Sequence, residues 1–232
     1  MRPFWLLATL FVALMPVAGR AQTAPVVVEL FTSQGCSSCP PADALLTQLA
    51  AQPGVIALAL HVDYWDYLGW QDSFASPAFS ARQKAYAKAR GSRSIFTPQM
   101  MVQGFDSMVG HDEMRIRDRI AAHQAIPPAA RLDLRRDGAA LVIRITPGTT
   151  PVEPAEVHVV RFTPSHDVAI EGGENAGQII TYSNIVESWE TVAIWDGATA
   201  AELRHEGLDD APVAVILQHG RVGPVLTAAS LP

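Results

Sequence analysis

Short apolar runs alternate with helix-like segments along the first half of the chain. Residues 25–31 and 55–62 have the composition of buried strands, and residues 42–51 between them have a helical composition that stops before a Gln-Pro-Gly turn. A strand, a helix and a second strand in this order are expected to form a right-handed crossover with parallel strands. The loops that follow the two strands should therefore leave the sheet from the same edge.

The next elements continue this alternation. Ser76-Pro77 has the residues of a helix start, because serine caps a helix and proline fits its first position, and Gly91 ends that helix. A short strand follows Pro98, a second strand lies around residues 107–109, and a helix spans about residues 112–123. The first half therefore reads as an α/β unit.

Beyond residue 126 the pattern changes to strands. Residues 132–145 alternate apolar and polar positions on both sides of Asp137-Gly138, which is a strong hairpin signal. Further strand-like runs lie at residues 157–162, 178–182, 185–195 and 213–217. We predict an α/β protein with two domains: residues 22–126, and a β-rich C-terminal domain, residues 127–232, that forms a small antiparallel sheet or sandwich packed on the first.

Residues 1–21 have the pattern of a secretory signal peptide. Arg2 supplies a basic start, residues 4–15 are almost wholly apolar, and small residues lead to Ala21, after which we expect cleavage. The apolar run is too short to span a bilayer. We therefore expect a periplasmic or secreted protein with no stable membrane insertion after cleavage.

The charge balance narrows the range of partners. The full chain has 17 Lys and Arg residues against 23 Asp and Glu residues, a formal net charge of −6. Arg2 and Arg20 leave with the signal peptide, so 15 basic residues remain and the net charge becomes −8. An acidic chain is poorly suited to nucleic acid or to an anionic membrane surface, and we expect neither as a partner.

Cys36 and Cys39 are the only cysteines of the chain and form one C-x-x-C motif directly after the first strand. Two thiols delivered by a strand to the start of a helix are typical of a thiol–disulfide redox site. We expect Cys36, at the exposed end of the loop, to attack as a thiolate and Cys39 to resolve the mixed disulfide. The cysteines carry the electrons, so no cofactor is implied, and the expected partners are protein or small-molecule thiols and disulfides of an exported compartment.

Two prolines follow the motif directly. Pro40-Pro41 disfavours the α conformation at Cys39 and Pro40, so the regular helix is expected to begin only near Pro41. A later helix start would place the helix dipole further from Cys36 and stabilise its thiolate less. The Ser-Ser pair between the cysteines does not indicate the direction of electron flow.

The order of elements over residues 25–125 resembles the thioredoxin fold. In that fold the residue that matches Pro98 is a cis-proline, and its loop packs against the disulfide and offers backbone groups to an incoming peptide. The resemblance implies a cis Thr97–Pro98 bond and assigns Thr97 and Pro98 to the site together with Cys36 and Cys39.

A narrower resemblance is carried by the run Glu29–Asp43, with its C-S-S-C, and by the segment His61–Asp66. Both resemble a secreted, thioredoxin-like bacterial family catalogued as domain of unknown function 1223. The similarity extends over nearly the whole mature chain, including Gly173-Glu174-Asn175 and Tyr182-Ser183-Asn184. It implies a fold and an exported location but no established reaction.

Two other uses of the cysteines stay open. A structural disulfide is one, although closing a ring of four residues stabilises the chain by only about 2 kcal/mol. The second is a non-catalytic exported binding protein whose pocket holds a peptide or a soft metal ion such as Cu(I), with Cys36, Cys39 and His61 as ligands.

The segment His61–Asp66 also has two interpretations. Asp63 could relay a proton to or from Cys39 as a general base. Alternatively, these polar residues cap and turn the loop at a strand end, while Tyr64, Trp65 and Trp70 pack over the sheet edge or line a groove for a peptide. The glycine-rich segment 171–177 is either an exposed turn or a lip over the redox site.

Overall fold

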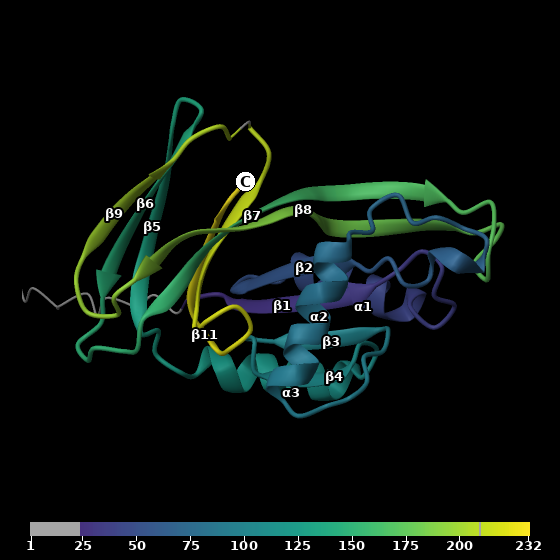
Figure 1. Ribbon diagram of the computed structural model, residues 1–232, viewed down its shortest axis with the longest axis horizontal. Helices are drawn as coiled ribbons and strands as arrows, with labels where there is room; N and C mark the ends of the chain where they lie inside the picture. The colour runs from purple at the N-terminus through teal and green to yellow at the C-terminus, as the bar shows by residue number, and fades with distance from the viewer. Residues whose placement is uncertain (1–23, 209) are drawn as a thin grey trace, which may run out of the picture.

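The computed structural model describes residues 24–208 and 210–232, so the predicted signal peptide, residues 1–21, lies outside the described part. The protein is a mixed α/β structure. A large sheet has the strand order β11-β10-β7-β8-β2-β1-β3-β4, and a second, three-stranded sheet has the order β5-β6-β9 (Figure 1).

Helices and strands succeed one another along the described residues. In sequence order they are β1 (Val26–Thr32), α1 (Pro40–Ala50), β2 (Val55–His61), the 3₁₀ helix η1 (Asp66–Leu68), α2 (Pro77–Ala89), β3 (Gln99–Val102), β4 (Asp106–Val109), α3 (Glu113–Gln124), β5 (Ala130–Asp137), β6 (Ala140–Pro147), β7 (Ala155–Ala169), β8 (Ile179–Trp195), β9 (Ala201–His205), β10 (Val213–Gln218) and β11 (Val225–Leu231).

Helices cover both faces of the sheet formed by β1 to β4. β1 pairs in parallel with β2 and antiparallel with β3. On one face, α2 contributes Phe79 and Tyr86 to the core; on the other, α1 and α3 contribute apolar side chains such as Leu46 and Ile116. Because both faces are covered, every residue of β1 is buried, which explains why the sequence shows a continuous apolar run instead of an alternating one.

Helix α1 begins at Pro40, one residue from the expected start near Pro41, but the prediction that the proline pair disfavours the α conformation at Cys39 and Pro40 was wrong. Cys39 itself adopts the α conformation, with φ −80° and ψ −35°. Its carbonyl accepts hydrogen bonds from the backbone N–H groups of Ala42 (2.8 Å) and Asp43 (3.1 Å), which offset the unfavourable position before proline. Prolines in the first turn also lose nothing, because the N–H groups there have no partner within the helix.

The second half is antiparallel β, and the predicted hairpin at Asp137-Gly138 joins β5 to β6. It differs from the expected arrangement because β7, β8, β10 and β11 do not form a separate sheet. They continue the sheet of the first half through a parallel contact between β2 and β8, at Ala59 and Ile185 (Figure 1). The pairing gives the open edge of β2 a partner for its backbone groups.

The small sheet β5-β6-β9 packs against the far part of the large sheet. Its apolar face contributes Leu141, Ile143 and Ile145, which meet Val157 of β7 and Val215 of β10 in one core cluster. This part of the chain therefore has the sandwich character that the sequence predicted, but one of its two layers belongs to the large sheet.

Three segments distant in sequence meet at one end of the large sheet. They are the loop after β1, the loop after β2 and the tip of the long β7–β8 hairpin, which reaches the right-hand end of Figure 1. The backbone N–H of Gln34 donates to Asp72 at 2.8 Å, so the first two loops are in contact, as the crossover predicted. In the described residues, no helix has the length and apolar character needed to cross a membrane.

Candidate redox site

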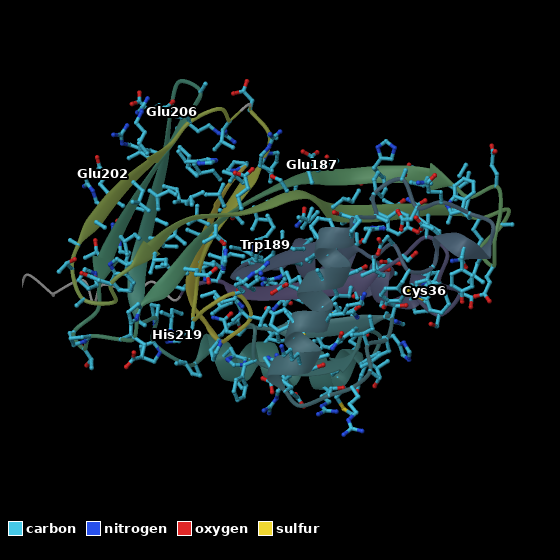
Figure 2. All side chains as sticks on the ribbon, in the orientation of Figure 1. Cys36, Glu187, Trp189, Glu202, Glu206 and His219 are labelled. Atoms are coloured by element: carbon cyan, nitrogen blue, oxygen red, sulfur yellow. A yellow bond between two sulfur atoms is a disulfide. The ribbon has the colours of Figure 1, made fainter. Side chains whose placement is uncertain are left out.

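Cys36 and Cys39 form a disulfide with an S–S distance of 2.09 Å and a Cα–Cα distance of 5.4 Å. Cys36 lies at the end of the sheet where the three segments meet (Figure 2). It is only 1% exposed and Cys39 is 0% exposed, whereas the two serines between them are exposed. The expectation that Cys36 lies at the exposed end of its loop was therefore wrong, because segments from elsewhere in the chain cover it.

One covering segment is the glycine-rich stretch 171–177. The side-chain amide of Asn175 donates to the carbonyl of Gln34 at 2.9 Å and to that of Cys36 at 3.0 Å, and Asn175 is 2% exposed. Gly172 approaches the next loop so closely that a Cβ would lie 2.7 Å from the carbonyl oxygen of Gly69. The segment thus lies over the redox loop as a lip, which is one of the two interpretations of its sequence.

The Thr97–Pro98 bond is cis, as the resemblance predicted. The Thr97 hydroxyl donates to Cys36 Sγ at 3.3 Å and accepts from the indole N–H of Trp65 at 2.7 Å. Ser38 Oγ lies 3.4 Å from the same sulfur. The structure therefore brings Thr97 to the disulfide and adds Trp65, whose contact the sequence did not reveal.

Asp63 lies against the start of α2. Its carboxylate accepts a hydrogen bond of 2.5 Å from the Ser80 hydroxyl, and its backbone N–H donates to Ser80 Oγ at 3.2 Å. Within residues 24–208 and 210–232, Asp63 makes no hydrogen bond to either cysteine. Its role as a proton relay for Cys39 stays a prediction.

A second carboxyl group, that of Asp43, lies in the interior and was missed. Asp43 follows Cys39 by one turn of α1, so both occupy the same helix face. It is 3% exposed, and neither carboxyl oxygen has a hydrogen-bond partner in the described structure. Burial raises the pKa of Asp43 from 3.8 to about 7, against the opposing effects of nearby His61 and of the Thr32 hydroxyl. The signal in the sequence is an acidic residue within the apolar face Ala42, Leu45, Leu46 and Leu49.

His61 belongs to the same buried cluster. Its Nδ1 lies 2.7 Å from Asp72 Oδ2, and its ring meets Tyr182 edge-on with centroids 4.8 Å apart. Its Nε2 is buried and has no partner among the described residues, and the same holds for the hydroxyl of Thr32. Unpartnered polar atoms of Thr32, Asp43 and His61 thus lie together in the interior beside the redox loop, where leaving them unsatisfied costs free energy.

The arrangement gives no support to a metal site of Cys36, Cys39 and His61. The two sulfur atoms are bonded to each other, and His61 Nδ1 is engaged with Asp72. In the part of the chain that the structure describes, no three His, Cys, Asp or Glu side chains are grouped so that they could hold a metal ion.

Comparison with known proteins identifies the family. A family model described as "Protein of unknown function (DUF1223)" matches residues 27–218. The chain belongs to this family. A search of the curated proteins gives no match.

Two solved structures are similar. One is the crystal structure of a protein from Agrobacterium tumefaciens, whose sequence is 33% identical to this chain. It has a TM-score of 0.79, and the match covers 91% of this chain and 96% of that one. HBP35 of Porphyromonas gingivalis is 14% identical, with a TM-score of 0.62, over 90% of this chain and 75% of that one. The second likeness concerns the fold alone.

Proposed function

We propose that this DUF1223 protein is an exported thiol–disulfide oxidoreductase that works through Cys36 and Cys39. The observation that carries the proposal is the placement of the disulfide between the first turn of α1 and the cis Thr97–Pro98 bond, with the Thr97 hydroxyl on Cys36 Sγ. A disulfide bonded at a helix start, beside a hydroxyl that can stabilise a thiolate, is chemically suited to exchange.

The order of elements supports a thioredoxin-like fold for residues 22–126. Within it, β1, α1, β2, α2, β3, β4 and α3 follow one another, and the strands lie in the order β2-β1-β3-β4. The β-rich residues 127–232 are then an addition that widens the sheet and supplies the lip with Asn175. The cis-proline loop would be the platform that an incoming peptide meets.

The exchange cycle starts from the oxidised protein. A partner thiolate attacks Cys36 Sγ, the bond to Cys39 Sγ breaks, and the electron pair of that bond leaves on Cys39, which takes up a proton. A second thiolate of the partner then attacks the partner sulfur that is bonded to Cys36 Sγ, and Cys36 leaves as a thiolate. Two electrons have passed from the partner dithiol, now a disulfide, to the protein. The reverse sequence oxidises the protein and reduces the partner.

Each sulfur has a neighbour suited to its role. The Thr97 hydroxyl donates to Cys36 Sγ, and such a bond strengthens when the sulfur becomes an anion. Cys39 is as buried as Cys36, but in the described structure no side chain donates a hydrogen bond to its sulfur, so a thiolate there is less stabilised and protonation is favoured. The buried carboxyl of Asp43, with its pKa raised to about 7, lies one helical turn from Cys39 and can hold a proton near neutral pH.

The competing proposal is a structural disulfide in a non-catalytic binding protein. Against it stands the short ring, which stabilises the chain by only about 2 kcal/mol. A structural disulfide would also not require the buried, unpartnered polar atoms of Asp43 and His61 beside it. An exported location, proposed from residues 1–21, would expose the pair to oxidants and to exported partner thiols.

Trapping of a mixed disulfide tests the proposed function. Cys39→Ser leaves Cys36 without its resolving thiol. We expect its Cys36 thiolate to attack disulfides of exported proteins or an added peptide disulfide, releasing one partner thiol and accumulating the covalent adduct. Cys36→Ser is the matched control, because it keeps the resolving cysteine and lacks the attacking one, and it should form no adduct. A Cys39→Ser protein that folds, reacts with a small alkylating agent and yet forms no adduct would count decisively against the oxidoreductase.

A further inference from the structure

We infer that Trp65 is a positioning residue of the redox site, because its indole N–H fixes the Thr97 hydroxyl as a hydrogen-bond donor to Cys36 Sγ. This inference rests on the proposed function and assigns a role to a residue that makes no hydrogen bond to either sulfur atom in the described structure. It is carried by two hydrogen bonds in series, from Trp65 Nε1 to Thr97 Oγ1 at 2.7 Å and from Thr97 Oγ1 to Cys36 Sγ at 3.3 Å.

The direction of this chain follows from the number of hydrogens available. An indole nitrogen can only donate, so Thr97 Oγ1 must accept from Trp65. A threonine hydroxyl has a single hydrogen, and that hydrogen remains free to point at the sulfur of Cys36. Without Trp65, the hydroxyl could rotate and turn a lone pair toward the sulfur instead.

The indole of Trp65 is partly buried and packs against the core cluster that contains Phe79 and Tyr86. Trp65 is the N-cap residue of η1, and its carbonyl accepts a hydrogen bond from the backbone N–H of Leu68 at 3.0 Å. A Cβ at Gly35 would lie 3.3 Å from Trp65 Cβ, so the tryptophan packs directly on the residue before Cys36. A donor already aligned in the folded protein loses little freedom when charge develops on the sulfur.

The effect should depend on the oxidation state. In the disulfide, Cys36 Sγ is neutral and a weak acceptor, whereas the thiolate of the reduced protein accepts strongly. The Trp65–Thr97 chain therefore stabilises the reduced thiolate more than the disulfide. It should raise the thiolate fraction of Cys36 near neutral pH and make the Cys36/Cys39 pair more oxidising.

The test compares alkylation of Cys36 as a function of pH in a Cys39→Ser background. Trp65→Phe keeps an aromatic ring but removes the N–H, and Thr97→Val keeps the shape of threonine but removes the hydroxyl. We expect each to raise the pH midpoint of alkylation by about one unit, a tenfold loss of thiolate below the midpoint. With Cys39 restored, a tenfold change in the exchange equilibrium corresponds to a potential about 30 mV lower.

Three further variants make the result specific. Thr97→Ser retains the hydroxyl and should retain the wild-type midpoint. Trp65→Phe combined with Thr97→Val should shift the midpoint no further than Thr97→Val alone. Trp195→Phe is the control for losing a buried indole donor, since Trp195 bonds the Thr199 carbonyl at 2.6 Å in the other half of the chain, and it should leave the midpoint unchanged.

The inference is overturned if folded Trp65→Phe has the wild-type midpoint, or if its shift is the same size when Thr97 is already valine. Should Trp65→Phe fail to fold, Trp65→Leu, which removes the N–H and introduces no new donor, takes its place. The outcome is separable from that of the adduct experiment: adducts with an unchanged midpoint reject only the role of Trp65, whereas a shifted midpoint without adducts rejects the oxidoreductase and keeps the hydrogen-bond chain.

Discussion

The buried carboxyl of Asp43 makes a quantitative prediction about stability. Its pKa is raised to about 7 in the folded protein, mainly by burial, from 3.8 as the ordinary value. Between these pH values the folded protein holds a proton that the unfolded chain has lost, so this group makes stability fall as pH rises from about 4 to about 7. Above pH 7 this loss of stability is complete. At about 1.4 kcal/mol per pKa unit, it lowers the free energy of unfolding by roughly 4 kcal/mol.

Asp43→Asn removes the charge and leaves the shape nearly unchanged. Because neither carboxyl oxygen has a partner in the described structure, no hydrogen bond is lost. We expect the free energy of unfolding of the variant to exceed that of the wild type by up to roughly 4 kcal/mol at pH 8.5 and to differ little from it near pH 4. Urea unfolding of the oxidised protein between these pH values measures the difference.

Asp118→Asn is the matched control, since Asp118 is exposed on α3 and its substitution also removes one negative charge. It should change stability little at any pH. The reasoning is refuted if Asp43→Asn alters the free energy of unfolding by the same amount at both ends of the pH range, or if it destabilises the protein more at pH 8.5 than at pH 4. Either result would mean that Asp43 does not hold its proton near neutral pH.

Two other substitutions test the lip and the core. Asn175→Ala removes both hydrogen bonds that hold segment 171–177 over the redox loop. We expect dithiothreitol to reduce the disulfide several-fold faster and the free energy of unfolding to fall by about 1–3 kcal/mol. An unchanged reduction rate would show that the lip does not limit access to the disulfide. Arg82→Met leaves Glu29, which is 0% exposed and bonded by Arg82 at 2.7 and 2.9 Å, without its cation, and should cost about 3–5 kcal/mol in urea unfolding. Arg117→Met breaks an exposed pair and should cost about 1 kcal/mol or less, so equal losses in the two variants would contradict the argument from burial.

Signals that are local in sequence predicted local structure well. Ser76 caps α2 and its hydroxyl accepts from the N–H of Ala78, and Asp137-Gly138 turns the β5–β6 hairpin. Each of these features is decided by a few neighbouring residues, whose backbone preferences do not depend on the rest of the fold.

Features that depend on distant contacts were missed. The backbone carbonyl of Cys36 accepts a hydrogen bond from Asn175, which is 139 residues away in the sequence, and nothing near the C-x-x-C indicates this contact or the burial of Cys36. The extension of the sheet from β2 to β8 depends on one parallel contact between Ala59 and Ile185. Asp43 could have been found as an acidic residue on an apolar helix face, but its proximity to His61 becomes visible only once α1 packs on the sheet.

The reduction potential of the Cys36/Cys39 pair tests the central claim most directly. The mature protein is equilibrated in glutathione or dithiothreitol buffers, and the thiols are alkylated and counted by mass. We expect a potential between about −120 and −270 mV, the range of known exchange catalysts. A value well below about −300 mV would mark a stable structural disulfide and contradict the oxidoreductase.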